Sequence, residues 1–324
     1  MERIDTHCHI VPSGWRKWCE RHGWDKPDGM PGIPEWSTEA HIELMEKLNI
    51  KRSILSITSS GTHLKVGNFE LARQVTRETN DEIAETHRRY PDKFSFFASL
   101  RLPDPEGSVQ EIERVRDMEG CCGFTMMTNA QGHYLGDEVY RPVFEKLNEK
   151  PTVIFIHPTQ CCSKDNSAAD KPLAQYPTPM MEYYFDTTRA VVNLLLTQTV
   201  TKYTNLTFLV SHCGATLPTL VERVGAFSTG LLKEDTKLSS AGIKELLRTR
   251  FCFDLAGFPF PDLIQGYLRI EDAGRLLYGS DHPYTPGVLV ENLGKVMDEN
   301  ITELFKQETV ASIYSGNAKQ LFRF

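Results

Sequence analysis

The chain has 324 residues, of which 40% are hydrophobic and 24% are charged, and its formal net charge is −7. This negative charge argues against nucleic acids and anionic membrane surfaces as partners. The sequence has no apolar run of about 18 residues, the minimum for a transmembrane helix. A strand-like segment at residues 2–5 leaves no room for a signal peptide, and the eight cysteines lack CxxC spacing. We therefore expect a cytoplasmic protein with reduced thiols.

Short apolar runs alternate along the chain with segments of helical periodicity. The runs "TVIFIH" and "LTFLVSH" are almost continuously apolar, which is typical of strands buried on both faces of a parallel sheet. The segment "STEAHIELMEKLNI" has apolar residues at helical spacing, and Ser37 or Thr38 can cap its start. The eight predicted strands span residues 2–5, 53–58, 94–100, 123–128, 152–157, 206–212, 251–255 and 275–280.

Eight strands that alternate with helices predict an α/β fold, specifically a parallel (β/α)8 TIM barrel. A doubly wound open sheet is the alternative, but it would usually have a glycine-rich loop where "HCHIVP" follows the first strand. Two insertions, at residues 12–36 and 159–184, follow strands and are expected on the carboxyl-terminal face, where barrels build active sites. No linker or repeat divides the chain, so we expect residues 1–324 to form one barrel domain.

The ends of the predicted strands carry imidazole and carboxylate side chains. The first strand runs into His7 and His9, the fifth ends at His157, the sixth ends at His212, and the eighth runs into Asp281. Because the carboxyl ends of barrel strands share one face, we expect these side chains to converge on one pocket. Residues i and i+2 of a strand point the same way, so both histidines of the first pair can face inward.

Three of these histidines and the aspartate form a ligand set that suits one divalent metal ion, with zinc expected and manganese as the alternative. A coordination position left open for water or substrate would indicate a catalytic ion. Asp5 is a candidate carboxylate behind the ligands. Asp281 could also serve only as a helix cap. The remaining histidines are interpreted as structural: His22, His41, His63, His87, His133 and His282.

Four motifs give the chain a family resemblance: "IDTHCHI", "IHPT", "SHCGATLP" and "GSDHPY". In this order they resemble the amidohydrolase superfamily, over essentially the whole chain. More narrowly, the chain is similar to the mononuclear, non-oxidative decarboxylases, which include aminocarboxymuconate semialdehyde, γ-resorcylate and 6-methylsalicylate decarboxylases. The stretches "PDGMPGIPEWSTEAHI" and "SILSITSSGTHL" most resemble the fungal 6-methylsalicylate decarboxylases.

The resemblance implies metal-dependent decarboxylation of a small ortho-hydroxy aromatic acid, with the conversion of 6-methylsalicylate to m-cresol favoured, in aromatic acid or polyketide metabolism. It implies His7, His9, His157 and Asp281 as metal ligands and His212 as a catalytic histidine. Asp281 would also protonate the ring carbon that loses the carboxylate, and His212 would relay protons.

The resemblance also implies a homodimer, in which Arg223 reaches the active site of the neighbouring subunit. Trp36 and Phe185 are further candidates for contact with the aromatic substrate. The chain departs from the γ-resorcylate type at Ala215, where that type has a glutamate, and at His7, where it has an acid. Residues 121–131 contain no lysine, which favours one metal ion over two.

Two other functions stay open at this point. The same metal site could activate water for hydrolysis of a lactone or an amide, with Asp281 as the base. Alternatively, the barrel could have lost catalysis and serve as a binding protein, although the presence of every expected site residue argues against this.

Overall fold

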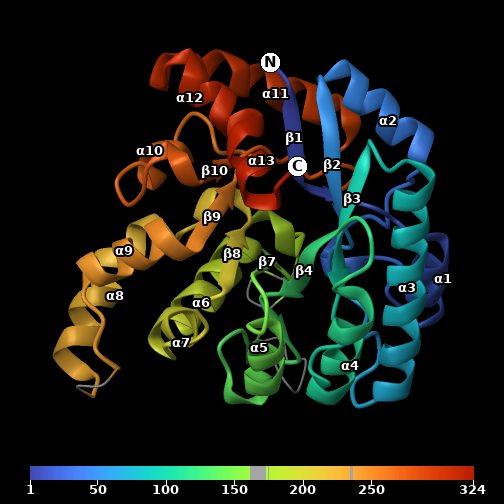
Figure 1. Ribbon diagram of the computed structural model, residues 1–324, viewed down its shortest axis with the longest axis horizontal. Coiled ribbons are helices and arrows are strands. Elements are labelled where there is room, and N and C mark those ends of the chain that lie inside the picture. Colours follow the sequence, from blue (N-terminus) through green and yellow to red (C-terminus); the bar gives the residue numbers. More distant parts are fainter. Residues whose placement is uncertain (161–172, 174, 234–235) are drawn as a thin grey trace.

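The computed structural model describes residues 1–160, 173, 175–233 and 236–324. Eight parallel strands form one sheet in the order β1–β2–β3–β4–β7–β8–β9–β10. The two edges of this sheet are joined, because the Thr6 N–H donates to Tyr278 O, and the N–H groups of Ser280 and Asp281 donate to His7 O. The sheet therefore closes into a barrel, with the helices arranged around it (Figure 1). The predicted (β/α)8 fold is confirmed.

The barrel strands are β1 Arg3–His9, β2 Ile50–Ser56, β3 Phe94–Ser99, β4 Cys121–Met127, β7 Thr152–His157, β8 Leu206–Val210, β9 Phe251–Asp254 and β10 Leu276–Leu277. A small hairpin joins β5 Asn129–Ala130 and β6 His133–Tyr134. The helices are α1 Ser13–Arg21, α2 Thr38–Lys47, α3 Phe69–Arg89, α4 Pro105–Val115, α5 Arg141–Leu147, α6 Glu182–Leu196, α7 Thr199–Lys202, α8 Leu217–Leu231, α9 Ser240–Arg250, α10 Leu263–Tyr267, α11 Gly287–Leu304, α12 Gln307–Ala311 and α13 Asn317–Phe322.

Each predicted strand corresponds to a barrel strand, and the bounds of β7 match the prediction at both ends. Strand β2 begins three residues before and ends two residues before its predicted bounds, and differences of similar size lie at the two edges that close the barrel. Strand β1 continues through His9, so the two histidines lie within the strand and not after it. Strand β10 ends at Leu277, because the chain beyond it meets β1 through single hydrogen bonds without a regular ladder. Ser37 caps α2, as expected, by accepting a hydrogen bond from the Ala40 N–H at 3.1 Å.

Apolar side chains fill the barrel interior and leave only its carboxyl end for polar chemistry. Phe97 and Phe155 stack at a ring-centroid distance of 5.3 Å. Phe322 of α13 packs against Phe97 at 5.8 Å, so this C-terminal helix covers the amino-terminal end of the barrel. At the carboxyl end of these apolar side chains, the ring of Phe155 contacts the imidazole of His7 at a centroid distance of 5.0 Å.

Within the described part of the chain, no helix is long and apolar enough to cross a membrane. The described cysteines are free thiols, and Cys8 is fully buried with its Sγ 3.5 Å from Ile54 O. Cys161 and Cys162 of the second insertion lie outside the described residues.

Candidate metal centre and active site

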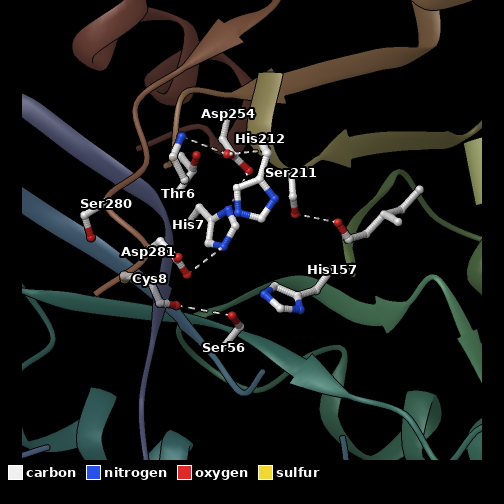
Figure 2. A network of polar contacts seen from close by, with 12 residues as sticks. Thr6, His7, Cys8, Ser56, His157, Ser211, His212, Asp254, Ser280 and Asp281 are labelled. Atoms are coloured by element: carbon white, nitrogen blue, oxygen red, sulfur yellow. Dashed lines mark hydrogen bonds and ion pairs between the residues drawn. The ribbon is translucent and has the colours of Figure 1, made fainter. Parts of the chain in front are cut away.

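Four side chains from β1, β7 and the segment after β10 meet at the carboxyl end of the barrel. One ligand atom from each of His7, His9, His157 and Asp281 lies within 4.8 Å of the others. Asp281 Oδ1 is 3.1 Å from His9 Nε2 and 3.5 Å from His7 Nε2. Figure 2 shows the side chains of His7, His157 and Asp281 pointing toward one another. The structure thus brings together all four residues that the sequence proposed as ligands.

Hydrogen bonds behind two of the imidazoles decide which ring nitrogen faces the cluster. His157 Nδ1 donates to the Pro158 carbonyl at 2.7 Å. His9 Nδ1 lies 3.1 Å from Ser56 Oγ, and that hydroxyl donates its own proton to Cys8 O at 3.2 Å. His9 Nδ1 must therefore be the donor to Ser56. Each ring consequently presents an unprotonated Nε2 to the cluster, the form that binds a metal ion.

Asp254, the last residue of β9, holds the third imidazole. Its Oδ2 accepts a hydrogen bond from His7 Nδ1 at 2.9 Å, and neither side chain is exposed to solvent. Its Oδ1 accepts from the backbone N–H groups of His212 and Ala256 at 3.0 and 3.1 Å. Sequence reasoning missed Asp254 and offered Asp5, which instead accepts from the His7 backbone N–H at 3.2 Å. The available signal was the acid that ends the apolar strand "FCFD".

The donor set fits a divalent metal ion. His7 Nε2 is buried and has no hydrogen-bond partner, a costly arrangement for a polar atom unless a ligand occupies the space before it. Three imidazole nitrogens and one carboxylate oxygen suit zinc or manganese.

His212 follows β8 and lies beside the cluster. Its ring centroid is 5.0 Å from that of His7, and Tyr184 stacks on its other side at 5.7 Å. Burial, and then the charge of His7, lower the pKa of His212 to about 4, so the ring is neutral at physiological pH. His212 and Asp281 have φ angles of 56° and 58°. Non-glycine residues rarely adopt this left-handed conformation, and such residues cluster at active sites.

A pocket of about 490 Å³ opens above these residues, and its floor includes His157, His212 and Asp281. We call it the metal pocket. A cavity of this size suits a small organic ligand. No lysine or arginine is among its described lining residues. The walls come from four segments of the carboxyl-terminal face: Pro27, Asp28 and Met30; Pro177, Pro179, Met180, Tyr183 and Tyr184; Gly257 and Phe258; and Tyr284, Thr285, Pro286 and Leu289. Thr58 and Ser59 complete the lining.

Comparison with known proteins places this site in a family. The family profile described as amidohydrolase matches residues 4–324. The chain belongs to the amidohydrolase family. It is 30% identical over 327 residues to a 6-methylsalicylic acid decarboxylase from Penicillium expansum, covering 99% of this chain and 96% of that protein. The resemblance predicted from the four motifs is thereby confirmed.

Two solved structures share the fold over the whole chain. A crystal structure of an amidohydrolase II superimposes with a TM-score of 0.87 at 27% identity, covering 100% of both chains. The 5-carboxyvanillate decarboxylase of Novosphingobium aromaticivorans, complexed with manganese and 4-hydroxy-3-methoxy-5-nitrobenzoic acid, superimposes with a TM-score of 0.84 at 23% identity. The match covers 100% of this chain and 96% of that enzyme.

The three residues predicted to contact the substrate lie outside the lining of the metal pocket. Trp36 donates from Nε1 to His41 Nδ1 at 3.1 Å and packs against the core. Phe185 is 39% exposed. Arg223 lies on the exposed side of α8 with its guanidinium 4.6 Å from the ring of Phe227. Within a single chain, none of these side chains is placed to touch a substrate at the metal pocket.

Metal uptake should release a proton from His7. Burial alone would lower the pKa of His7, but the charges of Asp254 and Asp281 outweigh it and raise this pKa to about 10. In the metal-free chain at pH 7, Nε2 therefore carries a proton that a metal ion must displace. We expect zinc binding to release about one proton and the apparent affinity to rise from pH 7 to pH 9. Calorimetric titration in two buffers of different ionisation enthalpy measures this, and binding without proton release would contradict it.

Replacing Asp254 by asparagine should weaken metal binding by about 10–100-fold, the usual effect of removing an acid that supports a ligand histidine. Zinc binding to this variant should also release less than one proton, because His7 loses the neighbouring charge of Asp254, which raises the pKa of His7. Asp186→Asn is the matched control, since Asp186 is equally buried, accepts hydrogen bonds from Thr128 and Asn129, and lies outside the cluster. Equal metal affinities for the two variants would count against a supporting role of Asp254.

Proposed function

We propose that this protein is a metal-dependent carboxy-lyase, which removes CO2 without oxidation from a small aromatic acid that has an ortho hydroxyl group. The preferred substrate is 6-methylsalicylate, and the product is m-cresol. The observation that carries the proposal is the cluster of His7, His9, His157 and Asp281, of which His157 and Asp281 line the metal pocket. Similarity to a decarboxylase of 6-methylsalicylic acid along nearly the whole chain supports the reaction class.

His7, His9 and His157 would hold the metal ion through Nε2, and Asp281 would hold it through a carboxylate oxygen. When bound, the ion would supply the positive charge that binds and polarises an aromatic carboxylate with a neighbouring oxygen. Zinc is our preferred ion, and manganese is supported by its presence in the 5-carboxyvanillate decarboxylase.

The charge of the pocket supports a substrate that is bound at the metal. Because the described lining has no lysine or arginine, no side chain there can neutralise the carboxylate of an aromatic acid. Tyr184, stacked on His212, offers an aromatic face beside the floor. A hydroxyl ortho to the carboxylate gives the substrate two adjacent oxygens, so such acids should be bound better than acids without it.

Asp281 is placed to move the proton that the reaction needs. Burial would raise its pKa, but the neighbouring imidazoles of His7 and His9 outweigh this and hold the pKa well below its usual range, so the resting carboxylate is ionised. It would accept the proton of the phenolic hydroxyl and pass it to the ring carbon that bears the carboxylate. The bond from that carbon to CO2 then breaks, and its electron pair restores the aromatic ring. The phenolate regains a proton from solvent, with neutral His212 available as the relay.

Turnover in deuterated water tests the proposal. Metal-loaded protein incubated with 6-methylsalicylate should release CO2 and m-cresol with one ring deuterium at the former carboxyl position, detected by mass spectrometry. The same assay with 2-methylbenzoate, which lacks the hydroxyl, should give at least 100-fold slower release, because general acid–base catalysis of this kind contributes about 10²–10⁴-fold. Failure with 6-methylsalicylate and related ortho-hydroxy acids, with metal bound, would favour hydrolysis of a lactone or amide.

We also propose that the chain forms one barrel domain, that it is cytoplasmic, and that it forms a homodimer in which Arg223 enters the partner's site. For the dimer, the exposed position of Arg223 on α8 leaves it available to a second subunit. Light scattering and the turnover of Arg223→Gln would test the dimer and this role together.

A further inference from the structure

A second cavity, of about 390 Å³, lies beside the metal pocket on the same face of the barrel. We call it the side pocket. Its walls include Trp24, Leu64, Leu100, Leu102, Met126 and Met127, which give it an apolar interior. Its polar groups come from the carboxyl ends of β3 and β4, from the hairpin after β4, and from the segments that follow β2 and β7. None of these residues belongs to the proposed catalytic machinery.

A thin partition separates the two pockets. Thr58 and Ser59 line the metal pocket, and the next residue, Ser60, lines the side pocket. In the same way, His157 belongs to the metal pocket and Thr159 to the side pocket. Ser59 and Thr159 share a hydroxyl–hydroxyl hydrogen bond of 2.6 Å that joins the two segments of the partition. Only this partition would therefore separate a molecule in the side pocket from the reaction site.

The side pocket contains polar groups without partners. Ser99 and Thr125 are each only 3% exposed, and their side-chain oxygens, Oγ and Oγ1, make no hydrogen bond. These two residues are register partners on β3 and β4, so their side chains lie side by side. Gln131 Nε2 is a third buried polar atom without a partner. Leaving such groups unsatisfied is unfavourable, so their gathering in one cavity points to a ligand that carries a hydrogen-bonding group.

The charge of the side pocket selects against anions. Its described lining has no lysine, arginine, aspartate or glutamate. Burial lowers the pKa of His63, so that imidazole is neutral, and the other lining histidine, His133, is paired with Asp137 at 3.0 Å. An aromatic acid would lose the hydration of its carboxylate there without gaining a counter-charge.

We propose that the side pocket binds a small uncharged phenol, the chemical class of the product that decarboxylation would release. The ring would contact the apolar walls, and the hydroxyl would bond to Ser99 and Thr125. The identification of the phenol as product rests on the proposed function, whereas the binding itself does not. The anionic substrate would stay in the metal pocket, and the neutral product would have a separate place to bind.

Crystals of the metal-loaded protein grown with 3-bromophenol would locate the phenol by the anomalous scattering of bromine. We expect bromine in the side pocket, with the phenol oxygen within hydrogen-bond distance of Ser99 or Thr125. The anion 3-bromobenzoate, of similar size, should be absent from the side pocket. Bromine confined to the metal pocket, ordered water alone in the side pocket, or equal occupancy by phenol and benzoate would overturn the inference.

A pair of near-isosteric substitutions tests the hydroxyls in solution. The double variant Ser99→Ala, Thr125→Val should weaken binding of 3-fluorophenol to the side pocket by about 10–100-fold, the effect of losing two hydrogen bonds. Fluorine NMR would follow the bound resonance. Thr79→Val is the matched control, because its hydroxyl is also buried and unpartnered but does not line the side pocket. Equal losses in both variants would show a general packing effect and overturn the assignment.

These binding experiments need no turnover, so they separate the two proposals. Decarboxylation of 6-methylsalicylate without phenol in the side pocket would overturn this inference alone. Phenol in the side pocket of a protein that turns over no ortho-hydroxy acid would support the inference and count against the proposed function.

Discussion

Asp281→Asn should lower kcat for 6-methylsalicylate by about 10³-fold, within the range that a positioned acid–base group contributes. Asparagine has nearly the same shape, and its amide oxygen can stay near His7 and His9, but it cannot carry the proton from hydroxyl to ring carbon. Metal content, measured by atomic emission, should therefore fall much less than kcat does. Thr285 donates a hydrogen bond to Asp281 Oδ2 at 3.0 Å, so Thr285→Val should change kcat in the same direction but only modestly.

The control for this prediction is Asp262→Asn, at an exposed aspartate near the same end of the barrel. Its kcat and metal content should both match those of the unchanged protein. If Asp281→Asn retained metal and also retained a kcat within tenfold of the unchanged protein, the proton would have to come from another group. His212 would then be the remaining candidate, because its neutral ring lies beside His7.

The barrel, and the convergence of His7, His9, His157 and Asp281 at one end of it, could be predicted from the sequence for one physical reason. Parallel strands end at the same face, so a polar residue at the end of an apolar strand must lie near the ends of the other strands. His157 closes "TVIFIH", and His7 and His9 alternate with the buried Cys8 in β1. The two-residue period of a strand therefore determines both the position and the direction of these side chains.

The walls of the metal pocket were less predictable, because they come from loops and the starts of helices. Tyr183 and Tyr184 line the metal pocket, but the neighbouring Phe185 does not, and a sequence does not reveal the phase of a helix that follows an irregular insertion. Trp36 was expected to contact the substrate, but its indole N–H is used by His41 within the core.

Asp254 was missed for a different reason. Any acid at a strand end can support a ligand, cap a helix or bind metal, and only the distance of 2.9 Å to His7 Nδ1 separates these roles. The left-handed φ angles of His212 and Asp281 were equally unpredictable, because neither residue is a glycine, the usual sign of such a turn. Chemistry that depends on strand period was predictable, whereas chemistry that depends on individual contacts follows only from the three-dimensional arrangement.

His157→Ala should abolish tight metal binding. His157 supplies the ligand atom from β7, and without it the cluster keeps only residues from β1 and the segment after β10. We expect the zinc affinity to fall by more than the roughly 10–100-fold that loss of a supporting residue costs. Zinc at 100 times its Kd should stabilise the unchanged protein by about 2.7 kcal/mol, and this gain should disappear in the variant. Thermal unfolding of each protein with and without zinc measures it.

Comparing each variant with its own metal-free form is essential, because His157 is 2% exposed and its removal leaves a cavity that destabilises the fold by itself. His22→Ala serves as the histidine control. The His22 ring stacks on Trp18 at a centroid distance of 5.9 Å, outside the cluster, so the response of His22→Ala to zinc should match that of the unchanged protein. A full stabilising response of His157→Ala to zinc would mean that the ion binds elsewhere. The proposed decarboxylase would then lose its metal centre, since no other cluster of three such residues occurs within residues 1–160, 173, 175–233 and 236–324.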